Sequence, residues 1–106
     1  MEGAAYTKRG YAYYSLCDYK RAIEFYQQSL SIVKEIGDRD TEGRVYIDLG
    51  VAHGCVGYYE KEIELYQQAL SITKEIGDKR SEGRAYTNLS IACRYLGDYK
   101  KAIEFG

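Results

Sequence analysis

The strongest constraint on the fold is an internal repeat with a period of 40 residues. Residues 23–38 read IEFYQQSLSIVKEIGD and residues 63–78 read IELYQQALSITKEIGD, so 13 of 16 positions are identical. When the chain is shifted along itself by 40 residues, 30 of the 66 aligned pairs are identical. A fixed period of about 20 to 50 residues is typical of solenoids, in which each repeat packs only on its neighbours. The sequence therefore predicts a repeat array rather than a closed globular core.

Within each unit, apolar residues recur at helical spacing, and Gly or Asp separates the apolar stretches. This pattern predicts antiparallel helix pairs joined by short turns. The predicted fold is all-α, with five full helices at about 2–16, 19–36, 39–55, 59–76 and 80–95, and a truncated sixth that begins near Tyr99 after a turn at Gly97. We expect one domain of about two and a half repeats, with boundaries at about 2–38, 39–78 and 79–106.

Composition excludes several classes of function. The net charge is −1, so bulk charge gives no reason to expect nucleic-acid binding. No apolar run approaches the roughly 18 residues of a membrane span, and no secretion leader is evident. Cys17, Cys55 and Cys93 are each 38 residues apart, which fits neither a disulfide framework nor a zinc site. We therefore expect reduced thiols, a cytoplasmic location, and no metal or cofactor.

Nor does the sequence carry the motifs of an enzyme. It contains no phosphate-binding loop and no nucleophile elbow. His53 is the only histidine, and Tyr13 and Cys93 hold its place in the sister units, which favours a packed core position for His53 and Cys93 over a catalytic role. Cys55 is expected on the other side of its helix, near the helix end. We predict that the protein is not an enzyme.

Aromatic and small residues recur at matching positions of the three units. The set comprises Tyr6, Gly10, Ala12, Tyr19 and Ala22, then Tyr46, Leu49, Gly50, Ala52, Gly57 and Tyr59, then Tyr86, Leu89, Ala92, Gly97, Tyr99 and Ala102. This pattern resembles the tetratricopeptide repeat, and the 40-residue period with KEIGD and EGRAY-x-NL is more similar to the long-helix subclass of Pins/LGN-type scaffolds. The resemblance implies a right-handed superhelix of helix pairs and a role as adaptor or scaffold.

Three residues depart from the family pattern. Arg9 stands where Leu is usual, Ser90 replaces the small Gly, and Glu62 replaces the Ala at the closest approach of two helices. A buried carboxylate without a partner would cost several kcal/mol. We therefore expect Glu62 to lean outward or to find a basic partner.

One stripe on the first helix of each pair changes its chemistry from unit to unit, as a binding surface would. In a stacked array this stripe is expected to line the concave wall. Arginine forks suit carboxylates, and aromatic side chains supply contact area, so the stripe predicts binding of an extended, acidic peptide. A solvated helix face is the alternative interpretation. The candidate residues are Lys8, Tyr11, Arg44, Asp48, Val51, Arg84, Asn88, Ile91, Arg94 and Tyr95.

The resemblance adds a specific expectation for this stripe. In Pins/LGN-type scaffolds, Arg and Asn four residues apart on successive first helices hold the ligand chain. Arg84 and Asn88 match that pair, and Arg44 with Asp48 matches half of it. The lysine-and-asparagine clamp of chaperone-binding repeats is not reproduced, so a reader of chaperone tails is not expected.

A structural role is the alternative function. The face of the fifth helix should pack against a full partner helix, but the predicted sixth helix is short. An uncapped solenoid end favours association. Stacking or helix exchange between copies would then form a homo-oligomer through Leu89, Leu96, Ile103 and Phe105.

Overall fold

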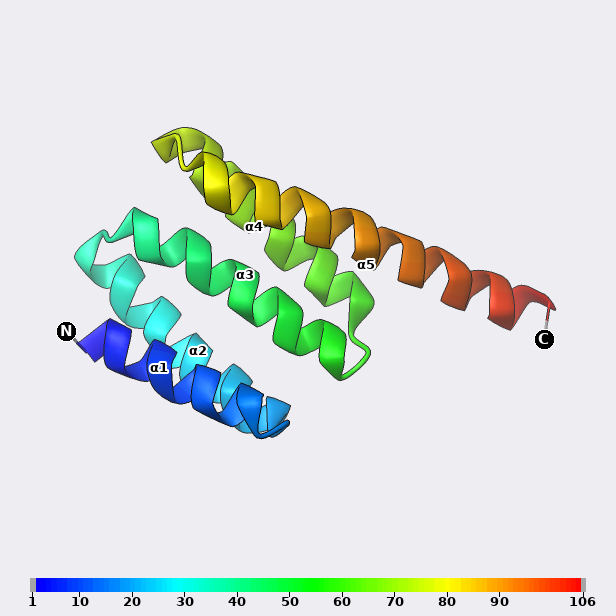
Figure 1. The fold of residues 1–106 in the computed structure, drawn as a ribbon, viewed down its shortest axis with the longest axis horizontal. Coiled ribbons are helices and arrows are strands. Elements are labelled where there is room, and N and C mark those ends of the chain that lie inside the picture. The colour runs from blue at the N-terminus through cyan, green and yellow to red at the C-terminus, as the bar shows by residue number, and fades with distance from the viewer. Residues whose placement is uncertain (1, 106) are drawn as a thin grey trace.

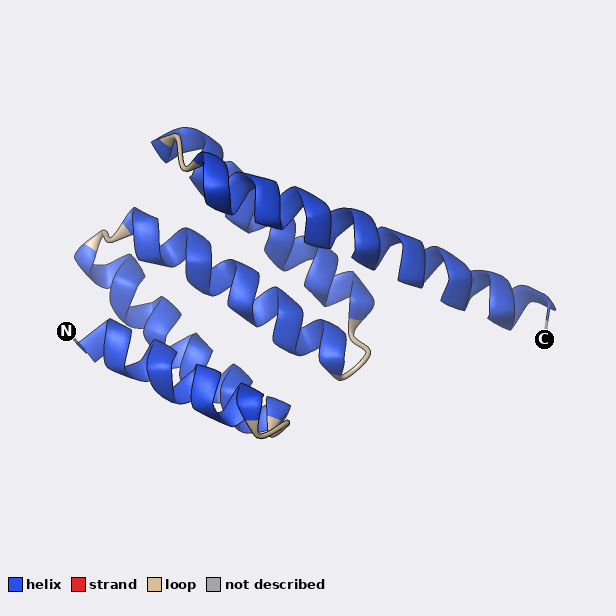
Figure 2. Ribbon diagram, viewed as in Figure 1, coloured by secondary structure: helices blue, strands red, loops and turns tan. Residues whose placement is uncertain are grey.

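A computed structural model describes residues 2–105, and this part of the chain is helical except for short turns. Five helices follow in order, and no strand occurs among the described residues (Figures 1 and 2). The helices are α1 (Glu2–Ser15), α2 (Tyr19–Ile36), α3 (Arg39–Cys55), α4 (Tyr59–Ile76) and α5 (Lys79–Phe105). The all-α prediction is confirmed, and the bounds of α2, α3 and α4 agree with those predicted.

The helices stack in chain order as antiparallel pairs. Each helix packs against the next, and α3 also touches α5. Figure 1 shows α1, α3 and α5 running side by side, with α2 and α4 behind them. The resulting body measures 49 × 30 × 19 Å, elongated as expected for a solenoid. None of the described helices is long and apolar enough to cross a membrane.

The turns between repeats are built by one glycine and one aspartate. Gly37 adopts the left-handed conformation with φ 75°, which ends α2, and the Asp38 side chain accepts a hydrogen bond from the Thr41 backbone N–H at 3.1 Å. The same arrangement recurs at Gly77 and Asp78. Glycine reaches this conformation without steric cost, and the aspartate satisfies an N–H that the helix leaves unpaired. The recurring GD dipeptide therefore fixes both connections between repeats.

The turn within the first repeat contains a cysteine where the second has a glycine. Gly57 has φ 86°, and Cys17 adopts the same left-handed region with φ 61°. The left-handed conformation costs a residue with a Cβ roughly 1–2 kcal/mol. The conformation that the repeat predicts is thus imposed on Cys17 by its neighbours.

The cap of α4 offers a stability prediction. Tyr58 occupies the N-cap position and makes no side-chain capping bond, whereas Asp18 caps α2 by accepting from the Arg21 N–H. Tyr58→Asp is expected to raise the free energy of unfolding by about 0.5–1 kcal/mol relative to Tyr58→Ala, measured by urea denaturation. Tyr58→Ala controls for loss of the ring. Equal stability of the two variants would contradict the capping argument.

Two tyrosines of the second helices form the centre of the core. Tyr26 and Tyr66 are 2% and 1% exposed, and their rings lie against Gly10 and Gly50. A Cβ at Gly10 would come within 2.6 Å of the Tyr26 ring. Glycine at these positions therefore allows each first helix to approach the ring of its partner helix.

The predicted turn at Gly97 does not form. Helix α5 continues through Gly97 to Phe105, and Gly97 is absent from the glycines with positive φ. The prediction of a separate sixth helix from Tyr99 was wrong. Only seven residues run from Tyr99 to the end of the helix, so a folded-back helix would bury little and would pay the cost of nucleation. Continuing α5 keeps the backbone hydrogen bonds instead.

The straight course of α5 also explains a second difference. His53 is buried and its Nδ1 donates to the Leu49 carbonyl at 2.9 Å, which confirms its packed position. Tyr13, at the matching position of the first repeat, is half-buried, but Cys93, at the matching position of the third, is exposed. The prediction of a core position for Cys93 was therefore wrong. The chain turns after α3 and brings the centre of the Tyr58 ring within 6.3 Å of that of the His53 ring, whereas α5 continues past Cys93 to Phe105 without a turn.

Glu62 finds a partner, but not a basic one. It is half-buried on α4 and accepts a hydrogen bond from the Tyr66 hydroxyl at 2.8 Å. A Cβ on Gly54 would come within 2.5 Å of the Glu62 carboxylate. Burial raises the pKa of Glu62, and the bond from Tyr66 partly offsets this. Glycine on α3 thus makes room for the large residue on α4.

Arg9, another residue that departs from the family pattern, is exposed, and its guanidinium lies 5.8 Å from the centre of the Tyr6 ring.

Candidate functional site

Three adjoining cavities line one side of the first helices. We call them together the groove. The first, about 350 Å³, lies between α1, α3 and α5 and includes Lys8, Arg44, Asp48 and Arg84. The second, about 260 Å³, shares Asp48 and Arg84 with it. The third, also about 260 Å³, adjoins the second at Val51. The groove therefore crosses all three repeats.

The first cavity is rich in cations, and their pairing differs. Arg44 is exposed and forms an ion pair with Asp40 at 2.9 Å, on the same helix. Lys8 and Arg84 are exposed and form no ion pair within the described part of the chain. Free guanidinium and ammonium groups at a cavity wall are suited to binding an anion.

Asp48 lies at the junction of the first and second cavities. It is half-buried and has no hydrogen bond or ion pair among the described residues. Burial raises its pKa to about 6, against the opposing influence of Arg84 and then Arg44. Loss of solvation thus outweighs the attraction of both arginines. The Asp48 carboxyl group is left without a bonded partner within the described part of the chain.

Tyrosines form the wall of the second cavity. Tyr11 and Tyr14 on α1 have ring centres 6.3 Å apart at an angle of 28°, and Tyr26 of α2 closes the cavity behind them. Tyr11 is 64% exposed, whereas Tyr26 is almost completely buried. Burial raises the pKa of Tyr26, so its hydroxyl stays protonated. The cavity is an aromatic pocket with one carboxyl group, that of Asp48, and one guanidinium group, that of Arg84, in its wall.

The third cavity is more apolar. It is formed by Val51, Asn88, Ile91 and Tyr95, together with residues of α3 and α4. Tyr95 stacks on Tyr59, with ring centres 6.2 Å apart. Cys55 also lines this cavity, as expected from its place on the groove side.

The structure brings nine of the ten candidate residues to the groove. Arg94 is exposed but lines none of the three cavities. Residues of the second helices complete the cavity walls, and these are Tyr26, Tyr59, Glu62 and Tyr66. The sequence prediction missed them because variation between repeats was compared only along the first helix of each pair. The repeated pairing of Tyr26 and Tyr66 with glycines on the first helices could have indicated two of them.

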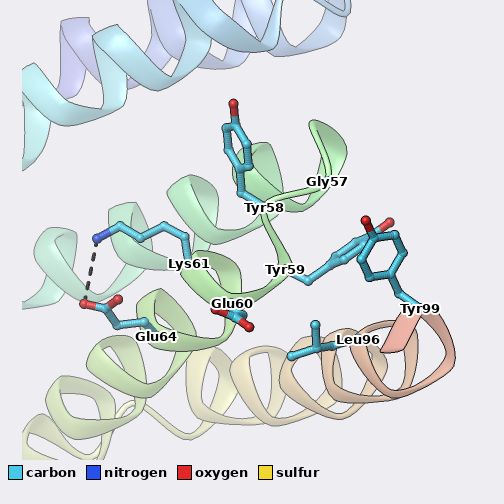
Figure 3. Close-up of a pocket in the computed structure, with 8 residues that line it drawn as sticks. All are labelled: Gly57, Tyr58, Tyr59, Glu60, Lys61, Glu64, Leu96 and Tyr99. Carbon is cyan, nitrogen blue, oxygen red and sulfur yellow. Dashed lines mark ion pairs between the residues drawn. The ribbon is translucent and has the colours of Figure 1, made fainter. Parts of the chain in front are cut away.

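A further hollow of about 520 Å³ lies outside the groove, where α5 passes the start of α4 (Figure 3). Tyr59 and Tyr99 point toward each other there, with ring centres 6.5 Å apart, while Tyr58 points away. Lys61 pairs with Glu64 at 3.8 Å on the other side. The hollow exists because α5 continues straight instead of folding back.

The candidate self-association residues are exposed to different degrees. Leu89 and Leu96 are half-buried, and Leu89 packs against the core. Ile103 is 65% exposed. The side chain of Phe105 lies outside the described residues. The exposed part of this surface is therefore the C-terminal half of α5.

Stacked helix pairs with this groove define a helical-repeat protein of the solenoid class. The tetratricopeptide repeat family model matches residues 2–75 and 59–106, so the chain belongs to the tetratricopeptide repeat family. Tetratricopeptide repeats generally mediate protein–protein interactions as scaffolds.

The same fold occurs in a solved structure. The crystal structure of the TPR domain of Arabidopsis FLU is similar over 99% of this chain and 97% of that chain, with a TM-score of 0.72 and 18% identity. At this identity the likeness shows the fold alone. No curated protein matches the chain.

Proposed function

We propose that the protein is an adaptor that binds an extended, acidic peptide segment along the groove. The observation that carries this proposal is the continuity of the three cavities across α1, α3 and α5. Such a surface could accommodate an extended chain over several residues. The groove residues also vary between repeats, whereas the packing residues are repeated.

The charge of the groove supports an acidic ligand. Lys8 and Arg84 line the first cavity without ion-pair partners in the described chain, and Arg44 adds a third cation. A ligand carboxylate could form charge-assisted hydrogen bonds with these groups.

We also infer that the chain belongs to the long-repeat, Pins/LGN-type subclass and that the protein is cytoplasmic. Arg84 and Asn88 both line the groove and support that subclass.

The test is direct binding of two matched peptides. A fluorescein-labelled dodecapeptide with four Glu, two Leu and one Lys in a Gly/Ser background is compared with the same peptide carrying Gln for Glu. Fluorescence anisotropy is expected to show tighter binding of the acidic peptide, weakened by added salt because the cations are exposed. Equal affinity for both peptides would contradict the proposal.

Self-association is the second candidate function, and one observation favours it. Residues 99–105 read YKKAIEF, and residues 19–25 at the start of α2 read YKRAIEF, so six of seven positions are identical. Helix α2 packs against α1, but the corresponding face of α5 leaves Cys93 exposed. Residues 99–105 of a second copy could cover that face by exchange.

Molar mass by light scattering across a concentration series tests this candidate. Exchange predicts a dimer that Ile103→Lys converts to a monomer, since Ile103 is exposed within one copy. Lys100→Glu, on the same segment, controls for added charge. A monomer at every concentration would contradict the candidate.

A further inference from the structure

The second cavity differs from the rest of the groove because it combines aromatic rings with a carboxyl group that has no hydrogen bond or ion pair among the described residues. We propose that the tyrosine side of this cavity is a subsite for an alkylammonium group, such as the side chain of a lysine in the bound peptide. The cavity is lined by Tyr11, Tyr14, Tyr26, Asp48, Val51 and Arg84. This inference rests on the proposed function and deepens it. The ligand is then acidic with one basic residue, rather than uniformly acidic.

The aromatic wall favours a cation. Tyr11 and Tyr14 present nearly parallel rings with centres 6.3 Å apart, and Tyr26 closes the cavity from α2. The faces of aromatic rings are negative, and they attract ammonium groups within about 6 Å of the ring centre. A lysine side chain also has an apolar stem that could pack against Val51.

The carboxyl group separates this ligand from a purely apolar one. Asp48 has no hydrogen bond or ion pair among the described residues, although it borders two cavities. An apolar ligand would bury the carboxyl group further without a partner, which is unfavourable. An ammonium group would supply hydrogen-bond donors to the carboxyl group and would stabilise its ionised form.

The neighbouring charges set where the cation sits. The groups that face Asp48 are Lys8, Tyr11 and Tyr14 on α1, Tyr26 on α2, Arg44 on α3 and Arg84 on α5. Lys8 and Arg44 line only the first cavity, these tyrosines line only the second, and Arg84 lines both. A ligand carboxylate that binds Arg84 from the first cavity would neutralise it, and a ligand ammonium can then bind on the tyrosine side of Asp48.

The pH dependence follows from the same geometry. Asp48 has a pKa of about 6, and a cation binds only its ionised form. One pH unit below the pKa, about one tenth of the carboxyl groups are ionised. Affinity for a cation should therefore rise roughly tenfold between pH 5 and pH 7.5 and then level off. A ligand that binds protonated Asp48 would show the opposite trend.

The probe is Nα-acetyl-lysine amide, titrated into the ¹⁵N-labelled protein and followed by NMR. The expected result is binding that shifts the signals of Tyr11, Tyr14 and Asp48, with no comparable shift from Nα-acetyl-norleucine amide. Asp48→Asn should weaken binding at least fivefold and remove its pH dependence. Asp98→Asn, an exposed site on α5 outside the groove, should leave binding unchanged.

Each other outcome would overturn the subsite. Equal binding of the norleucine probe would indicate an apolar pocket, and affinity that falls with rising pH would indicate a ligand acid. Binding of the acidic dodecapeptide without lysine-probe binding would leave the proposed function standing and refute the subsite. Tetramethylammonium binding without lysine-probe binding would assign the cavity to a free quaternary amine and refute a peptide lysine.

Discussion

Replacement of Gly50 by alanine is expected to lower the free energy of unfolding by about 3 kcal/mol. Gly50 lies where α3 crosses the buried ring of Tyr66, and a Cβ there would come within 2.8 Å of the ring Cδ1 and nearer still to Cε1. The ring is 1% exposed and its hydroxyl is bonded to Glu62, so it has little freedom to move aside. Overpacking of this kind typically costs about 1–3 kcal/mol. Thermal denaturation followed by circular dichroism should show a melting temperature about 10 °C lower or more.

The matched control is Gly83→Ala on α5. Gly83 is exposed within the helix, and a Cβ there would meet nothing within 4 Å. Alanine should stabilise the protein by about 0.5–1 kcal/mol, because glycine weakens a helix interior. Gly50→Ala and Gly83→Ala are thus expected to act in opposite directions. Equal melting temperatures for the two variants would show that contact with Tyr66 is not limiting.

The repeat predicted most of the fold because its local signals agree with its global packing. Gly37 and Gly77 end helices, Asp38 and Asp78 begin the next ones, and the structure has these turns where the sequence predicts them. Such signals act within four or five residues, so they can be recognised without knowing the tertiary structure. Four of the five helices follow from them directly.

The course of α5 could not be predicted in the same way. Gly97 and Asp98 repeat the local signal of the other turns, yet the helix continues through them. A turn forms only where the contacts of the following helix offset the free-energy cost of forming the turn and that helix, and the number of such contacts depends on tertiary burial. The same cause leaves Cys93 exposed while His53 is buried. Local sequence therefore proposed a turn that packing does not support.

The candidate site was predictable only on one side. Variation between repeats indicated residues such as Lys8 and Arg84, because packing does not require that stripe to change. Tyr26 and Tyr66 are buried in the core, and the structure shows that they also form cavity walls. Whether Asp48 has a bonded partner depends on the side chains that the fold brings near it. The periodicity of the sequence contains no information about those contacts.

Arg84→Glu is expected to weaken binding of the acidic dodecapeptide by roughly 30-fold or more in fluorescence anisotropy. Arg84 lines both the first and the second cavity and has no ion pair within the described chain, so its guanidinium is available to a ligand carboxylate. Charge-assisted hydrogen bonds contribute about 1.5–3 kcal/mol, and a glutamate in that place adds repulsion. Because Arg84 is exposed, helicity and melting temperature should stay unchanged.

Arg94→Glu gives the same change of charge on the same helix and serves as the control. Arg94 is exposed and lines none of the three groove cavities, so its replacement should weaken binding less than about threefold. At high salt the difference between the two variants should narrow, since part of the effect is screened. Equal losses in both variants would mean that net charge attracts the peptide without a defined groove. An unchanged affinity in Arg84→Glu would refute binding along this groove.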